Sequence, residues 1–85
     1  MSHGKQVEVE IQSSRGTRRF TFPEEEKISG VIRTAAEAFG FSLSDTFRLV
    51  LATNPSEPLQ PERTLASYRV GNGTVLILTD IGSGV

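Results

Sequence analysis

The sequence predicts an α+β fold in which one mixed sheet of four to five strands packs against one helix. Apolar residues alternate with polar ones near the start of the chain, and this period of two is typical of half-buried strands. Apolar residues then recur at helical spacing, after which the chain returns to short apolar runs separated by turns. With 85 residues, the chain has room for one small domain.

The first two strands form a β-hairpin. Residues 6–12 read QVEVEIQ, so that three aliphatic side chains share one face and two glutamates lie on the other. Residues 13–16 have turn composition, and residues 17–22 place Phe20 and Phe22 on one face of a second strand. Two strands joined by a short polar turn predict a hairpin with one buried face.

One helix follows Pro23, which ends the second strand because proline cannot donate to a ladder. Residues 24–26 are glutamates, which favour a helix N-terminus, and Gly40 fits the position after the helix end. Gly30 lies inside the helix at a cost of up to about 1 kcal/mol relative to alanine. The apolar positions at helical spacing are Ile28, Val31, Ile32, Ala35 and Phe39.

The second half of the chain predicts two more strands. Residues 47–52 form the third strand, residues 53–58 have loop composition, and residues 59–70 form a short segment. Residues 74–80 (TVLILTD) are apolar nearly throughout, which predicts a strand at the centre of the sheet. This order of elements is that of a β-grasp. We expect its core to contain Val7, Val9, Phe20, Ile28, Val31, Leu49, Leu65, Leu76 and Leu78.

Composition and charge argue against several classes of function. Nine basic and ten acidic residues give a formal net charge of -1, which is unsuited to a nucleic-acid binder that relies on phosphate attraction. We interpret the cluster of Arg15, Arg18 and Arg19 as a solvated hairpin end. No apolar run suits a signal peptide or a membrane span, so we expect a cytoplasmic protein that binds neither membranes nor nucleic acid.

The sequence offers no catalytic set. There is no cysteine, which excludes thiol nucleophiles and cysteine-ligated zinc, and His3 is the only histidine. Carboxylates are frequent, but none pairs with a plausible nucleophile or an apolar pocket. We therefore expect a protein without enzymatic activity, metal or cofactor.

The stretch LQPERTLASYRVGNGTVLIL resembles ubiquitin. The residues that fill the family's places there without a gap are Leu59, Arg63, Thr64, Leu65, Tyr68, Val70, Thr74, Leu76 and Leu78. The resemblance implies a ubiquitin-like domain over residues 6–80, with flexible ends at residues 1–5 and 81–85. It also implies that the Tyr68 hydroxyl bonds to backbone, and that the loop at residues 53–58 is about three residues longer than in ubiquitin.

The resemblance also gives the end of the chain a function. Ubiquitin-like modifiers are joined to target proteins through a terminal glycine carboxylate, which an activating enzyme adenylates before a conjugating enzyme receives the modifier. Counted from Tyr68, the residues of conjugation and processing are Gly82, Ser83, Gly84 and Val85. Val85 departs from the family's final glycine, and its β-branched side chain crowds its own carbonyl. We therefore expect a JAB-type peptidase of bacterial type to remove Val85 and leave Gly84 terminal.

A recognition face is implied on the third and last strands, where ubiquitin binds most partners through three aliphatic residues. The residues on this partner-binding face are Arg48, Val50, Ile77 and Thr79. Val50 keeps one aliphatic place, whereas Thr79 takes the second and Ser13 or Ser14 the third. Because few residues carry such interfaces, we expect eukaryotic ubiquitin-binding domains to bind this chain poorly.

Lys5 and Lys27 are the only lysines, so they are the candidate acceptors for chain formation.

Gly-Ser-Gly is also a linker composition, and chain ends are often unstructured. The alternative is therefore a non-conjugated binding module of a larger complex, such as a secretion system. A sulfur carrier is a weaker third reading, because the Arg-Thr-Leu and tyrosine block is not its signature.

Overall fold

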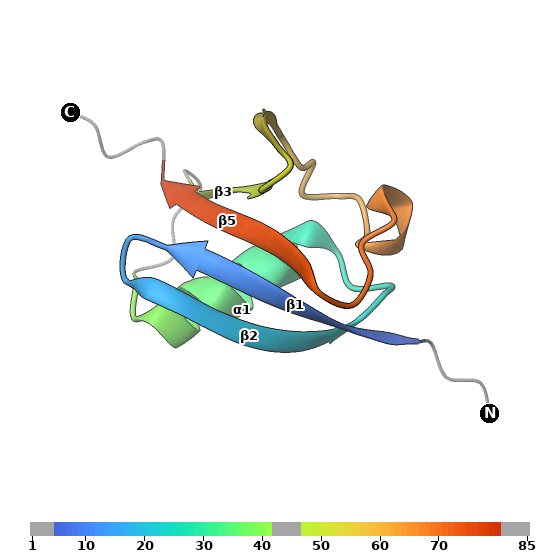
Figure 1. Cartoon of the computed structure of the whole chain (residues 1–85), viewed down its shortest axis with the longest axis horizontal. Coiled ribbons are helices and arrows are strands. Elements are labelled where there is room, and N and C mark those ends of the chain that lie inside the picture. The colour runs from blue at the N-terminus through green and yellow to red at the C-terminus, as the bar shows by residue number, and fades with distance from the viewer. Residues whose placement is uncertain (1–4, 42–46, 81–85) are drawn as a thin grey trace.

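One five-stranded sheet carries one helix across its inner face in the computed structural model, which describes residues 5–41 and 47–80 (Figure 1). The elements in chain order are β1 (Gln6–Ser13), β2 (Gly16–Pro23), α1 (Ile28–Phe39), β3 (Phe47–Leu51), β4 (Asn54–Pro58), the short 3-10 helix η1 (Ala66–Tyr68) and β5 (Thr74–Asp80). The sheet order is β2-β1-β5-β3-β4. β1 and β5 run parallel, and the other neighbouring strands run antiparallel. The predicted α+β class, the mixed sheet and the central last strand are confirmed.

The core lies between the sheet and α1. Alternate residues of β1, β3 and β5 face the helix, which buries one stripe of its own apolar residues against them. The largest fully buried side chains are Val9, Ile11, Ile28, Val31, Leu49, Leu65 and Leu76. Val7 and Leu78 are also buried, so the predicted core holds at every position except one.

Phe20 is the exception, because it is half-buried and packs against the side of the core. Phe22, two residues later on the same strand, is only 6% exposed. β2 is an edge strand, so no further strand covers the Phe20 ring on its outer side. The ring instead stacks on Phe22 with centroids 5.8 Å apart and meets Phe39 of α1 at 6.2 Å.

Backbone carbonyls of a distant segment accept hydrogen bonds from the start of α1. The helix begins at Ile28, so the three glutamates lie before its first turn rather than inside it. The Ile28 N–H donates to the Arg63 carbonyl at 2.8 Å, and the Ser29 N–H donates to the Pro61 carbonyl at 3.0 Å. At the other end Gly40 adopts φ 82°, which favours glycine, and confirms the predicted stop.

Arg15, Arg18 and Arg19 of the β1–β2 hairpin are exposed, as the sequence predicted, and two of them also bond to the end of α1. The Arg15 Nη1 donates to the Phe39 carbonyl at 3.2 Å and to the Gly40 carbonyl at 3.0 Å. The Arg18 Nη1 donates to the Ala38 carbonyl at 2.9 Å. The last carbonyls of a helix lack intrahelical partners and attract cations, so the hairpin supplies the charge that α1 lacks in its own last turn.

Residues 53–58 were predicted as a loop, but Asn54–Pro58 form the edge strand β4. Leu51 lies opposite Asn54 and Val50 lies opposite Pro58, with an irregularity in the ladder between Val50 and Leu51. Prolines lack the N–H that a central strand needs, but they are tolerated at the edge of a sheet. β3 and β4 therefore form a hairpin with β4 at the edge of the sheet.

Candidate functional site

The outer face of the sheet, on the side away from α1, carries the residues that the sequence assigns to partner binding. Arg48 lies directly opposite Thr79, and Val50 lies directly opposite Ile77, across the antiparallel pair of β3 and β5. Opposite residues of an antiparallel pair project to the same side. Their chain neighbours Leu49, Leu76 and Leu78 are in the core, which places the predicted four residues together on the outer face.

Exposure is uneven across this face. Val50 is 5% exposed although it does not belong to the core cluster, because Ile77 flanks it on β5 and Pro58 on β4. Ile77 and Thr79 are half-buried, and Pro58 is exposed. A partner that docks here would therefore contact chiefly Ile77 and Pro58, with Val50 as part of the floor.

Sequence reasoning missed Val75, which adds to the same apolar surface. Val75 is half-buried on β5 and lies beside Glu10 of β1 in the parallel register. It precedes Ile77 by two positions, so the period of two along TVLILTD could have placed both on one face.

Charged side chains border the apolar surface on both sides. The Glu10 carboxylate, which is half-buried, accepts a hydrogen bond from the Gln12 side-chain amide at 3.4 Å and lies opposite Arg19 on β2. On the β3 side, the Arg48 Nη1 donates to its neighbouring Phe47 carbonyl at 2.9 Å. The outer face is thus an apolar strip with a carboxylate along one border and a guanidinium along the other.

The hairpin turn beside this face is polar. The Ser13 hydroxyl donates to the Gly16 carbonyl at 3.2 Å and accepts from the Arg15 N–H at 3.0 Å. Ser13 is one of the two serines, with Ser14, that were predicted at the third aliphatic place of the recognition face. A serine that closes the turn adds no apolar surface, which supports the expectation of weak binding to ubiquitin receptors.

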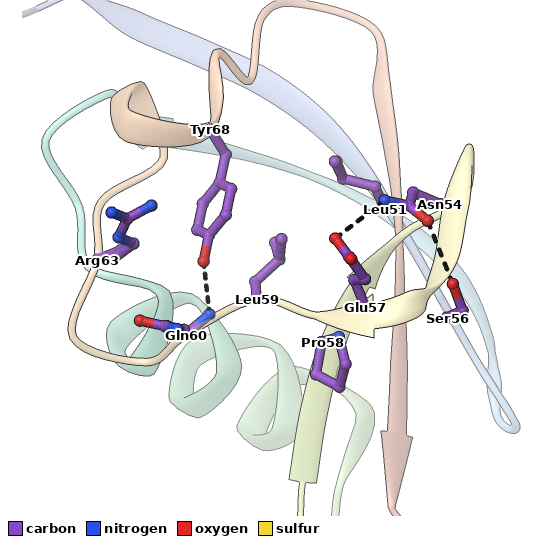
Figure 2. A pocket seen from close by; sticks show the side chains of 9 residues that line it. All are labelled: Leu51, Asn54, Ser56, Glu57, Pro58, Leu59, Gln60, Arg63 and Tyr68. Carbon is purple, nitrogen blue, oxygen red and sulfur yellow. Dashed lines mark hydrogen bonds between the residues drawn. The ribbon is translucent and has the colours of Figure 1, made fainter.

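A groove opens between the β3–β4 hairpin and η1 (Figure 2). Its volume is about 460 Å³, and its lining residues are Leu51, Asn54, Ser56, Glu57, Pro58, Leu59, Gln60, Arg63 and Tyr68. The Tyr68 hydroxyl accepts a hydrogen bond from the Gln60 N–H at 2.8 Å, so it does bond to backbone as the resemblance implies. We refer to this feature as the hairpin groove.

The two candidate acceptor lysines lie apart from the outer face. Both Lys5 and Lys27 are exposed. The Lys5 carbonyl accepts from the Glu24 N–H at 2.8 Å, and Lys27 forms an isolated bridge with Thr64 just before α1. Their ammonium groups are therefore carried on ordered backbone beside the sheet edge and the helix start.

The predicted conjugation residues Gly82, Ser83, Gly84 and Val85 lie outside the described residues, as do most of the predicted flexible ends at 1–5 and 81–85. The last described residue, Asp80, pairs with Phe47 at the end of β5. The chain therefore leaves the sheet next to Arg48 and Thr79, at one end of the outer face.

Within residues 5–41 and 47–80 no group of three or more His, Asp or Glu side chains is arranged to hold a metal ion. No helix of this described part is long and apolar enough to cross a membrane.

Comparisons with known proteins identify the fold. No protein-family model and no curated protein matches the chain. Among solved structures, a designed protein based on ubiquitin is 22% identical over 93% of each chain, with a TM-score of 0.76. The ubiquitin of Caldiarchaeum subterraneum is 18% identical, covers 95% of this chain and 100% of its own, and has a TM-score of 0.77. A ubiquitin-like domain of an Arabidopsis thaliana protein is 10% identical, covers 94% of this chain and 82% of its own, and has a TM-score of 0.77. At these identities the likeness establishes the fold, and that fold is a ubiquitin-like β-grasp.

Proposed function

We propose that this chain is a ubiquitin-like protein modifier of bacterial type, which is conjugated to target proteins through the Gly84 carboxylate after removal of Val85. The observation that carries the proposal is the position of the segment Gly82–Gly84. It follows the last strand of a ubiquitin-like β-grasp at the spacing from Tyr68 at which that family places its reactive tail.

Glycine suits such a tail for a steric reason. An activating enzyme must bring the terminal carboxylate to the α-phosphate of its nucleotide through a narrow channel, and a residue without Cβ lets the enzyme backbone approach closely. Val85 occupies the place of the family's final glycine, and its β-branched side chain crowds the carboxylate that must enter the channel. A peptidase that removes Val85 would therefore convert the chain from a form that the activating enzyme cannot adenylate into one that it can.

In this proposal the partner enzymes carry out the chemical steps. The chain itself acts as a substrate rather than as an enzyme, and it requires no cofactor of its own. Its partners are an activating enzyme, a conjugating enzyme and a JAB-type peptidase, all placed in the cytoplasm together with the target proteins. The tail carries Asp80 where the family carries arginines, so enzymes that read a basic tail should reject it.

An ATP-dependent thioester assay tests the proposal. The activating enzyme encoded nearest this gene is incubated with two forms of the chain, one ending at Gly84 and one ending at Val85. We expect the form ending at Gly84 to produce a thioester that thiols reverse, and the form ending at Val85 to produce none until it is trimmed. Equal charging of both forms would remove the processing step, and charging of neither would contradict conjugation.

A binding module is the second candidate function, because ubiquitin-like folds also occur as domains of larger proteins, as in the Arabidopsis thaliana domain. The apolar strip of Val75, Ile77 and Pro58 would then be the working surface, and the tail would be a linker. Charging of neither form, together with an adjacent set of secretion genes, would favour this function over conjugation.

A further inference from the structure

We propose that the hairpin groove binds an extended peptide of a partner protein, in which an aliphatic residue is followed by an acidic one. This site adjoins the outer face of the sheet, with which it shares Pro58, and the proposal does not depend on conjugation. Its volume of about 460 Å³ falls within the range of roughly 300–1,000 Å³ that is usual for ligand pockets.

The groove arises from the extension of β3 and β4. Leu51 ends β3 and Asn54 begins β4, and the two pair across a short turn. The strand then returns through Pro58 to Leu59, whose N–H donates to the Leu49 carbonyl at 2.8 Å. The hairpin therefore stands as one wall of the groove, opposite the loop that carries Arg63 and Tyr68 (Figure 2).

Leu59 and Leu51 form the apolar part of the groove floor. Leu59 is 4% exposed, and Leu51 is half-buried against the core. The Tyr68 ring is fixed by the hydrogen bond that its hydroxyl accepts from the Gln60 N–H. Figure 2 shows this ring standing beside Leu59, with Pro58 farther along the strand. An aliphatic side chain laid over these groups would lose its exposed surface without having to reorder the wall.

Arg63 supplies the polar anchor at one end. Its guanidinium carbon lies 5.7 Å from the centroid of the Tyr68 ring, a cation–π contact that holds the side chain at the groove. Its backbone N–H donates to the Gln60 carbonyl at 3.1 Å, whereas its guanidinium donates no hydrogen bond among the described residues. Five donors in a planar fork match a carboxylate in two-point contact, so an acidic side chain is the complementary group.

The polar side chains at the opposite end are already engaged with one another. The Asn54 side-chain amide donates to the Glu57 carboxylate at 3.3 Å, and the Ser56 hydroxyl donates to the Asn54 amide oxygen at 3.3 Å. The Glu57 carboxylate would repel a strand of phosphates that filled the whole groove. The charges therefore favour a peptide with one acidic group near Arg63 over a nucleic acid.

The test is an NMR titration of the full chain with a defined probe. The probe is the acetylated and amidated octapeptide Gly-Ser-Leu-Glu-Leu-Glu-Ser-Gly, and its matched control has glutamine in place of both glutamates. We expect amide shifts at Leu59, Gln60 and Tyr68 with a dissociation constant of about 1 mM or tighter. The control peptide should bind about tenfold more weakly, because it lacks the charge-assisted contact with Arg63.

Substitutions of Arg63 and Arg33 test whether the Arg63 guanidinium causes the preference for the acidic peptide. Arg63→Gln should abolish the preference for the acidic peptide, and Arg63→Lys, which keeps the charge but not the planar fork, should restore part of it. Arg33→Gln, on the exposed side of α1, removes the same charge away from the groove and should change nothing. An unchanged amide spectrum of the free variants would show that the fold is retained.

Three results would overturn the proposal. The first is equal affinity for the two peptides, and the second is a preference that survives Arg63→Gln. The third is an octauridylate RNA that shifts the same amides at least as strongly as the acidic peptide, which would make the groove a phosphate site instead. Loss of tail charging in the thioester assay would leave this result untouched, so the two proposals fail separately.

Discussion

Gly30 lies in the first turns of α1, where a glycine costs up to about 1 kcal/mol relative to alanine. The structure supplies the reason that the sequence could not. A Cβ at residue 30 would collide with the Glu26 carboxylate oxygen, because the Glu26 side chain folds over this position. The glycine thus makes room for a carboxylate next to the helix N-terminus, where negative charge is favourable.

We expect the cost of an alanine at residue 30 to depend on Glu26. In a Glu26→Ala background, Gly30→Ala should raise the free energy of unfolding by about 1 kcal/mol, which is the helix-propensity gain. In the wild-type background the gain should be smaller, because the Glu26 side chain must move away. Urea denaturation of the four chains measures this difference. The same gain in both backgrounds would show that the contact is unimportant.

At the scale of elements, the β1–β2 hairpin and α1 are joined by cations. Arg15 bonds to the Phe39 and Gly40 carbonyls, and its guanidinium carbon lies 4.6 Å from the Phe41 ring centroid. Periodicity predicted both elements, but it could not show that arginines of one would cap the other. That contact joins residues 24 and 25 positions apart in the chain, and it depends on tertiary packing.

Removing this cation should loosen the end of the helix. Arg15→Ala should lower the free energy of unfolding by about 1 kcal/mol, from the lost contact with the helix C-terminus and with the ring. Arg19→Ala is the matched control, because Arg19 lies on the same hairpin but opposite Glu10, and it should cost less than about 0.5 kcal/mol. Equal costs for the two variants in thermal unfolding would contradict this account.

β5 and β4 show where sequence patterns predict a strand correctly and where they do not. β5 was predicted as central because its residues are apolar nearly throughout, and it lies between β1 and β3 in the sheet. β4 was predicted as a loop because it contains Pro55 and Pro58. A proline has no N–H group to donate to a neighbouring strand. An edge strand tolerates this because only one of its two sides pairs with another strand. Sequence alone therefore could not separate β4 from a loop.

At the scale of the whole molecule, the fold and part of the outer face were predictable, whereas the hairpin groove was not. Val50 and Ile77 were assigned to one face from their alignment with ubiquitin, and the register of β3 and β5 places them opposite each other. The groove brings Leu51, Arg63 and Tyr68 together from separate segments. No periodic pattern links such residues, so only the packed structure shows their proximity.

The whole molecule also sets the expected form of the conjugates. With Lys5 and Lys27 as the only lysines, we expect targets to carry a single copy, or at most short chains through Lys5 or the N-terminus. Both lysines are exposed, so accessibility alone does not prevent linkage at Lys27. Long chains through Lys27 would show that a conjugating enzyme reads the start of α1, and they would contradict this expectation.

The most direct measurement is mass spectrometry of conjugates formed from the full chain with its activating enzyme, conjugating enzyme and peptidase. Arg69 is the last basic residue, so trypsin leaves the segment from residue 70 onward attached to the modified lysine of the target. The account predicts a branched peptide in which this segment ends at Gly84, joined through its carboxylate to the lysine amine, with Val85 removed. A branch that retains Val85, or the absence of any branched peptide although the target and all three enzymes are active, would contradict it.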